Sequence, residues 1–324
     1  MPATTFRTLI ARNKRNSFLL VAFFFLFTVV VVLLLSLGIV AYFAPGAVEN
    51  LEWGPALIVS GVAALLSYLL MRAAYYRGDK LILATMGAKP IQHTDDPELF
   101  NVVEEMAIAA GIPMPQVYLI EDSAPNAFAT GRDPQHASVA ITRGLRQKLT
   151  RDELQGVIAH EVSHIRNYDI RLMMLLAVLV GMIVLLADLF WQLLRSSYWT
   201  GGRRRGRSSK DGGGGLVAVI FLVVAVVLAI VAPLLAMLIQ LAVSRQREYL
   251  ADASAVELTR YPQGLANALR KIDRDPDVLE VANRGTAHLF IANPIKKFEA
   301  RANSWFSSHP PIQERIKRLE ALVK

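Results

Sequence analysis

The sequence contains no cysteine among its 324 residues. This absence excludes disulfide bonds, cysteine-ligated zinc or iron–sulfur sites and a cysteine nucleophile. Charged residues are also scarce, at 19% of the chain against about a quarter in an ordinary soluble protein. The hydrophobic share is 53%. This balance indicates a membrane protein, in which a net charge of +8 points to loops facing the cytoplasm or anionic lipid and not to nucleic acid.

Four apolar segments supply much of the hydrophobic share. They run from about 18 to 43, 55 to 71, 172 to 194 and 216 to 243. A helix needs roughly 20 apolar residues to cross a bilayer core. The first segment is too long for a secretory signal, and another apolar segment follows it at once, so we expect a membrane anchor. The sequence therefore predicts a mainly α-helical integral membrane protein.

The distribution of charge predicts how the chain is oriented. Basic residues precede the first segment and follow the second, whereas acidic residues lie between them: Arg7, Arg12, Lys14 and Arg15, then Glu49 and Glu52, then Arg72, Arg77 and Lys80. Because cytoplasmic loops carry the excess of Lys and Arg, the N-terminus and the residues from about 77 onward are expected in the cytoplasm.

The connection between the third and fourth segments conflicts with this rule. It is a basic, Gly-rich loop at 195–215, which would face outward if both segments cross the membrane. A hairpin that does not fully cross is the alternative. We favour crossing, because both segments are long and apolar enough and earlier spans tend to dominate orientation.

Four parts of the chain follow from these segments. Residues 1–76 form a two-span N-terminal anchor, 77–171 a first cytosolic part, 172–243 an apolar hairpin with the basic loop, and 244–324 a second, helical cytosolic part. In 77–171 the sequence predicts strands at 116–121 and 138–142 and a helix that starts at Asp95/Asp96 and ends at Gly111. In the last part it predicts helices over 244–258, 262–274 and 310–324.

A second helix of the first cytosolic part carries the most informative motif. Thr150 and Glu153 form a capping box at its start, and His160-Glu161-Val162-Ser163-His164 follows. Residues four apart share a face of a helix, so both histidines can bind one zinc ion. Glu161 can then reach a metal-bound water and remove its proton.

A catalytic zinc requires a third protein ligand. No histidine follows His164 closely, which leaves an acid on another helix. Glu248 can be that ligand, with Asp252 one turn later orienting a ligand histidine through its other ring nitrogen. By spacing alone, a helix with ordinary surface charges is an equally good interpretation.

These motifs together resemble the HtpX family of membrane zinc metalloproteases, relatives of the prenyl-protein CAAX endopeptidases. The resemblance rests on the His160–His164 motif, the run Arg247-Glu248-Tyr249-Leu250-Ala251-Asp252, "NAFATG" at 126–131, "SHPPIQERI" at 308–316 and the order of the apolar segments. It implies a cytosolic α+β zincin-like protease domain with a small β-sheet. It further implies endoproteolysis at the cytoplasmic side of the bacterial inner membrane, clearing damaged or misfolded membrane proteins under stress.

The resemblance also implies roles for single residues. One zinc ion per chain would be held by His160, His164 and Glu248. Glu161 would be the general base, and Asp252 would orient a ligand histidine. Asn126, Ala127, Phe128 and Ala129 match an edge strand that holds the protein substrate by strand addition. His309 matches a histidine that donates to the oxyanion, and Arg315 would help to place this histidine. The alternative is that "HPP" only marks the start of a helix. Asn167 and Asp169 match family positions, with a mere capping role as the alternative.

Other functions fit the sequence less well. A transporter or channel usually carries several ionisable groups in its spans, but here Asp188 is the only acid in the apolar segments. An inactive metal-binding scaffold or adaptor would not need the complete set of ligands and base. A specific prenyl-protein peptidase is a variant within the same enzyme class. The sequence predicts no nucleic-acid partner and leaves the oligomeric state open.

Overall fold

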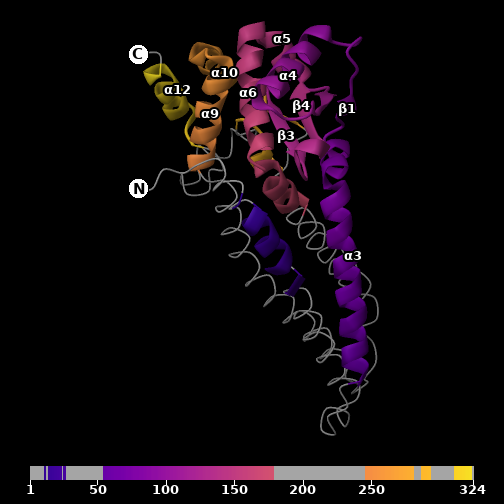
Figure 1. Cartoon of the computed structure of the whole chain (residues 1–324). Helices are drawn as coiled ribbons and strands as arrows, with labels where there is room; N and C mark the ends of the chain where they lie inside the picture. Colours follow the sequence, from indigo (N-terminus) through magenta and orange to yellow (C-terminus); the bar gives the residue numbers. More distant parts are fainter. Residues whose placement is uncertain are drawn as a thin grey trace, which may run out of the picture. The chain divides into compact units, whose positions relative to one another are not determined.

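The computed structural model describes residues 11, 14–23, 25–26, 54–178, 245–280, 286–292 and 310–322 (Figure 1). The chain divides into two compact units. One comprises Met1–Ser17, Tyr75–Val178 and Ile239–Lys324, and the other comprises Phe18–Ala74 and Leu179–Leu238. The predicted metal ligands and the small sheet belong to the first unit.

The described part of the second unit is helical. It includes the first part of α3 (Gly54–Thr85), which contains the predicted segment 55–71. Several large apolar side chains of this part are exposed: Phe18, Leu19, Leu26, Leu57, Ile58, Val62, Leu65 and Leu70.

In the part of the chain that the structure describes, no helix has both the length and the apolar character needed to cross a membrane.

Most of the other predicted membrane segments fall outside the described residues. This holds for 27–43, for 179–194, for the whole of 216–243 and for the basic loop 195–215. Residues 172–178 of the third segment are described and are helical. His309 also lies outside the described residues.

The first unit contains a four-stranded sheet in the order β1-β2-β4-β3. Its strands are β1 (Lys89–Pro90), β2 (Gln116–Ile120), β3 (Ala127–Gly131) and β4 (Ala137–Thr142). β2 and β4 run parallel, whereas β1 and β3 run antiparallel to their neighbours. The strands predicted at 116–121 and 138–142 are confirmed, and the "NAFATG" segment forms the edge strand β3.

Six described helices whose bounds lie within the first unit accompany this sheet: α4 (Pro97–Ala110), α5 (Arg143–Lys148), α6 (Arg151–Arg166), α9 (Arg245–Thr259), α10 (Pro262–Arg274) and α12 (Ile312–Ala321). The predicted starts are confirmed by their caps. The Asp96 side chain accepts from the Leu99 N–H at the start of α4, and Thr150 and Glu153 form the capping box of α6. Gly111 ends α4 with a left-handed φ of 67°. The predicted mixture of helices and a small sheet is thus observed.

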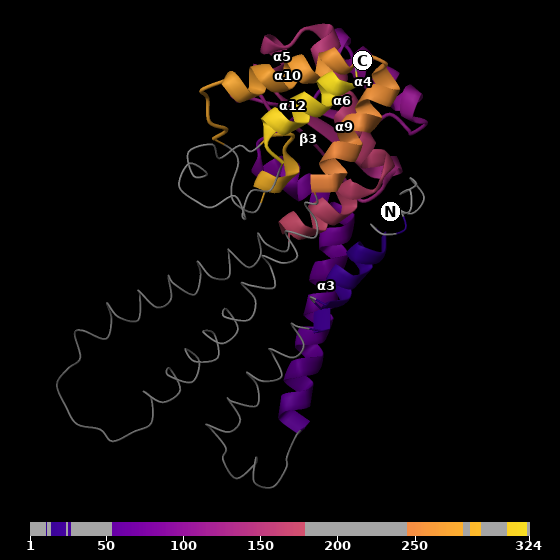
Figure 2. The ribbon, with the colours of Figure 1, turned by 90° about the vertical axis from the view of Figure 1, so that its left-hand side faces the viewer.

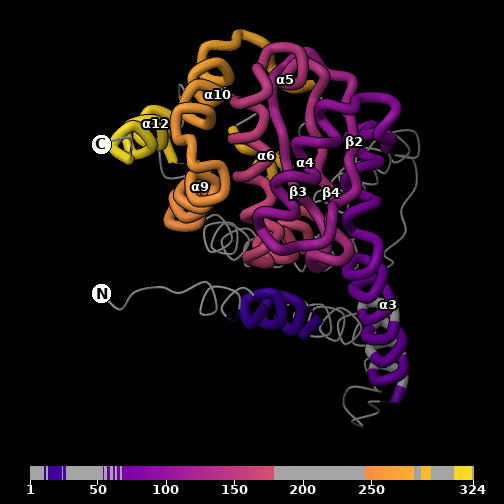
Figure 3. Tube along the Cα trace, turned by 45° about the horizontal axis from the view of Figure 1, so that its top comes forward, coloured from indigo at the N-terminus to yellow at the C-terminus, as the bar shows by residue number. Residues whose placement is uncertain are grey.

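Helix α6 is the centre of this unit. It packs against α4, α9, α10 and the edge strand β3 (Figure 3). Helices α9, α10 and α12 lie together on one side of it (Figure 2). Every residue from Gly156 to Ile165 is buried as a result. The polar motif of α6 therefore lies inside the protein.

Two glycines allow α6 and α10 to approach closely. A Cβ atom at Gly156 would lie 2.6 Å from the backbone nitrogen of Leu265, and one at Gly264 would lie 2.6 Å from the Asp152 carbonyl oxygen. Backbone atoms cannot rotate away as a side chain can, so any side chain at either position would push the helices apart.

We expect Gly156→Ala to lower the free energy of unfolding by about 1–3 kcal/mol, because the added methyl group overpacks the α6–α10 contact. Thermal unfolding of the full chain in detergent measures this. Gly61→Ala is the matched control, since a Cβ atom at Gly61 meets nothing within 4 Å. An equal melting temperature for wild type and Gly156→Ala would contradict the close contact.

Candidate metal centre

Helix α6 brings its two motif histidines together inside the protein, with their rings nearly perpendicular at 86°. His160 and His164 are one turn apart, and their Nε2 atoms lie 3.2 Å from each other. Their side chains are buried, because α9 covers this face of α6. Two imidazole nitrogens thus converge on one point.

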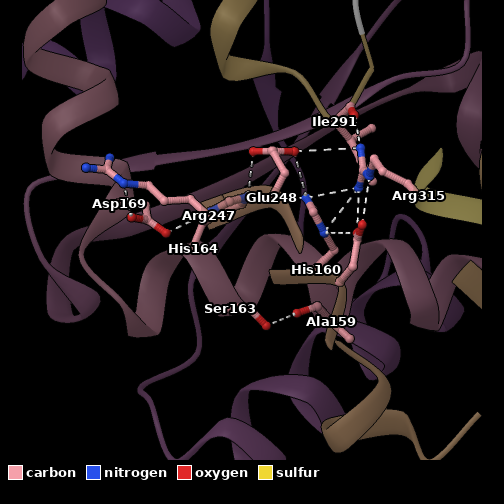
Figure 4. A network of polar contacts seen from close by, with 10 residues as sticks. Ala159, His160, Ser163, His164, Asp169, Arg247, Glu248, Ile291 and Arg315 are labelled. Carbon is pink, nitrogen blue, oxygen red and sulfur yellow. Dashed lines mark hydrogen bonds and ion pairs between the residues drawn. The ribbon is translucent and has the colours of Figure 1, made fainter. Parts of the chain in front are cut away.

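Helix α9 adds a carboxylate at the same point. Glu248 places Oε1 3.6 Å from Nε2 of His164 and Oε2 3.7 Å from Nε2 of His160. One ligand atom from each of the three residues lies within 4.8 Å of the other two. Figure 4 shows the Glu248 carboxylate linked by dashed lines to both histidine rings.

The other nitrogen of each ring contacts an aspartate. Oδ1 of Asp252 lies 3.0 Å from Nδ1 of His160, and Oδ2 of Asp169 lies 3.0 Å from Nδ1 of His164. A hydrogen bond at Nδ1 fixes the tautomer and leaves Nε2 free to bind a metal. Two such imidazoles with one carboxylate form a donor set that suits a catalytic divalent metal ion.

Arg315 from α12 holds Asp252 in place. Its side chain is fully buried and donates two hydrogen bonds to the carboxylate, from Nε to Oδ2 at 2.9 Å and from Nη2 to Oδ1 at 2.7 Å. Burial raises the pKa of Asp252, but the charge and hydrogen bonds of Arg315 outweigh burial and keep that pKa below its usual value. The sequence predicted that Arg315 places His309. His309 lies outside the described residues, so this role stays a prediction; among the described residues Arg315 contacts Asp252, Glu248 and the Ile291 carbonyl.

Glu161 is a buried carboxylate beside the first ligand. Burial raises its pKa to about 7, and the backbone N–H of Ala129 opposes part of this rise. Within the described residues, Oε1 of Glu161 has no hydrogen-bond partner. This oxygen is available to accept a proton at the site.

The two histidines differ in charge before a metal binds. Burial lowers the pKa of His160 to about 4. Burial acts in the same direction on His164, but the hydrogen bond to Asp169 and the charge of Glu248 outweigh it and raise that pKa to about 9. A metal ion would therefore compete with a proton more strongly at His164 than at His160.

The predicted substrate strand lies at the sheet edge, but one position of that edge is already used. The Ile291 N–H donates to the Ala127 carbonyl at 2.9 Å. The Asn126 side chain donates to the Ala292 carbonyl at 3.1 Å, and the buried Phe128 ring meets Phe290 edge to face. The structure thus covers the Ala127 end of β3 with the segment 290–292. The sequence contains no signal that predicts this contact.

The sequence left the role of Asp169 open and assigned none to Arg247. The structure places Asp169 against His164, and Nε of Arg247 lies 3.7 Å from Oδ1 of Asp169. Asp169 comes five residues after His164, and such residues do not share a face of a continuous helix. Asn167, the other open position, is the buried C-cap residue of α6.

Comparisons with known proteins identify the family of this chain. A model of peptidase family M48 matches residues 93–323. A "Protease HtpX homolog" of Thermoanaerobacter pseudethanolicus is 44% identical over 325 residues, covering 100% of both chains. One of Streptococcus thermophilus is 42% identical over 313 residues, covering 97% of this chain and 98% of its own.

One solved structure is also similar. The crystal structure of S. mikatae Ste24p matches with a TM-score of 0.45 and 20% identity, over 89% of this chain and 65% of that one. This value is too low to carry an argument. The family model and the full-length relatives confirm the predicted resemblance: the chain belongs to peptidase family M48, with the HtpX proteases, and is a metalloprotease.

Proposed function

We propose that this metalloprotease is a zinc-dependent endopeptidase that acts at the cytoplasmic face of the bacterial inner membrane. One zinc ion per chain would be held by His160, His164 and Glu248. The observation that carries this proposal is the convergence of these three buried ligand atoms, with both Nδ1 atoms engaged by aspartates. Its substrates would be misfolded or damaged membrane proteins.

The residues of the site divide the chemistry among them. Zinc would supply Lewis acidity toward the attacking water and the scissile carbonyl. Glu161 takes a proton from that water and passes it to the leaving amine, which its unpartnered Oε1 allows. Asp252, held by Arg315, keeps His160 in the orientation that binds zinc. His309 remains our candidate for a donor to the oxyanion.

An extended substrate would add to the edge strand β3. Among the described residues, no other strand pairs with the outer side of β3, and β3 packs directly against α6, which carries Glu161. Because Ile291 occupies the Ala127 carbonyl and the Ala129 N–H contacts Glu161, pairing would begin at the Ala129 carbonyl or would require Ile291 to leave. Asn126 would hold the end of the strand in place, and Phe128 would stabilise the strand by packing. Neither side chain would contact the substrate directly.

Membrane attachment is supported by the apolar segments and by the exposed apolar side chains of the second unit. We propose the anchor at 1–76 and the hairpin at 172–243, with both cytosolic parts, 77–171 and 244–324, on one side. The two ligand-bearing helices flank the hairpin, so an even number of crossings, or none, brings them together.

The lack of cysteine makes the orientation directly testable. We expect a membrane-impermeant maleimide to label Glu104→Cys, an exposed position of α4, only after the cell membrane is opened. Glu49→Cys, between the first two predicted segments, should be labelled in intact cells. Labelling of Glu104→Cys in intact cells would place the protease part outside and reject the proposed orientation.

Removal of a metal ligand should abolish metal binding. We expect His160→Ala, His164→Ala and Glu248→Ala each to lose the bound zinc, because two remaining ligands cannot hold it against a chelator. Metal analysis after dialysis of the purified protein measures this. His93→Ala, which removes an exposed histidine from the same unit, is the control and should keep the zinc. Zinc retained by all three ligand variants would refute the site.

Replacement of the general base should separate binding from catalysis. We expect Glu161→Gln to keep zinc but to lower proteolysis by about 10²–10⁴-fold, because an amide cannot accept the proton. The protein is purified in detergent with a chelator, zinc is added, and cleavage of casein and of the protein itself is followed. Asp152→Asn, an exposed position of the same helix, should cleave at the wild-type rate. Normal cleavage by Glu161→Gln would reject this mechanism.

A further inference from the structure

We propose that Asp169 is the positioning residue of His164, and that the left-handed turn at Tyr168 brings the Asp169 carboxylate to the His164 ring. The inference deepens the proposed function, since it rests on His164 being a metal ligand. It assigns to Asp169 the role toward His164 that Asp252 has toward His160.

The contact has the geometry of a buried hydrogen bond. Oδ2 of Asp169 lies 3.0 Å from Nδ1 of His164, and the aspartate is only 3% exposed. An Nδ1–H donated to this carboxylate leaves the Nε2 lone pair directed at His160 and Glu248, where the metal would sit. Such a partner also raises the basicity of the ligand nitrogen and fixes the plane of the ring.

A break in the helix makes this contact possible. On a continuous helix, residues five apart point about 140° away from each other around the axis. Here α6 ends at Arg166, Tyr168 has a φ of 59°, and helical conformation resumes at Asp169. A left-handed φ is uncommon for a residue with a bulky side chain, so the surrounding contacts must hold it.

Contacts with cationic side chains hold the Tyr168 ring. Nζ of Lys14 lies 4.3 Å from the centre of the ring, and the Arg171 guanidinium lies 5.0 Å from it. Arg171 is itself fixed, because its Nε donates to the carbonyl of Arg132. These contacts with the Tyr168 ring thus hold the turn, while the Asp169 side chain points to His164.

The neighbouring helix α9 completes the arrangement. Nε of Arg247 lies 3.7 Å from Oδ1 of Asp169, and Arg247 directly precedes the ligand Glu248. Helix α9 is therefore linked to both histidines. Its Arg247 contacts Asp169, the partner of His164, and its Asp252 contacts His160 directly. Each aspartate lies between a histidine and an arginine, so a shift of α9 against α6 would disturb both metal-binding rings.

The test is zinc affinity, measured on the full chain in detergent by competition with a chelator. We expect Asp169→Ala to weaken zinc binding by about 10- to 100-fold, and Asp169→Asn, whose amide oxygen can still accept from Nδ1–H, to weaken it less. The absorption spectrum of the cobalt-loaded protein should shift in the same order, because it reports ligand geometry. Thermal unfolding of the zinc-free proteins identifies a variant that is merely unstable.

A histidine–aspartate pair elsewhere provides the control. Asp133 contacts Nδ1 of the exposed His136 at 2.6 Å, so Asp133→Ala removes the same kind of bond away from the site. We expect it to bind zinc as wild type does. If Asp169→Ala does not fold, Asp169→Asn carries the test alone: weaker zinc binding supports the proposal, and wild-type affinity overturns it.

The turn is tested separately at Tyr168. Glycine adopts a left-handed φ freely, whereas a β-branched residue resists it. We expect Tyr168→Gly to keep the wild-type zinc affinity and Tyr168→Val to weaken it as Asp169→Ala does. Equal affinities for the two variants would overturn the role of the turn.

Failure of this inference differs from failure of the proposed function. If wild type does not bind zinc, or if His164→Ala binds it as tightly as wild type, the proposed metal site is wrong. If wild type binds zinc, His164→Ala does not, and Asp169→Ala matches wild type in affinity and in its cobalt spectrum, only the role of Asp169 is wrong.

Discussion

The burial of α6 is the constraint on which the site depends. Helices on several sides and the edge strand β3 remove the second half of α6 from water, although it carries two histidines and a glutamate. Buried polar groups are costly unless they have partners within the protein. The partners come from the end of α6 and from α9, with α12 supporting them from behind, and together they form the site.

The charges of these partners explain why a cation belongs at the centre. Four buried carboxylates, from Glu161, Asp169, Glu248 and Asp252, stand against two buried arginines, Arg247 and Arg315. Burial alone would make this excess of acids unfavourable. A divalent metal ion between the histidines would add positive charge there, which would link folding of the site to metal binding.

The edge of the sheet joins the metal centre to the rest of the protein. Ile291 donates to the Ala127 carbonyl through its N–H and accepts from Arg315 through its own carbonyl. One residue thus connects the strand to the arginine that holds Asp252. If a substrate added to β3 as proposed and moved Ile291 as a whole, the hydrogen bond from Arg315 to the Ile291 carbonyl would also be lost.

Local signals in the sequence define several elements of this protein. The capping box of α6 and its helical period are local, and they suffice to place His160 and His164 on one face. Asp96, Pro97 and Gly111 likewise defined α4, and the resemblance of the motifs identified the family.

Tertiary structure alone decided which groups meet around the ligands. Arg315 and Asp252 are 63 residues apart, and Ile291 and Ala127 are farther still, so no spacing rule relates them. Asp169 is close to His164 in sequence, yet its contact requires the left-handed turn at Tyr168, which propensity disfavours. These contacts follow from packing, because burial of α6 selects the partners that its polar groups require.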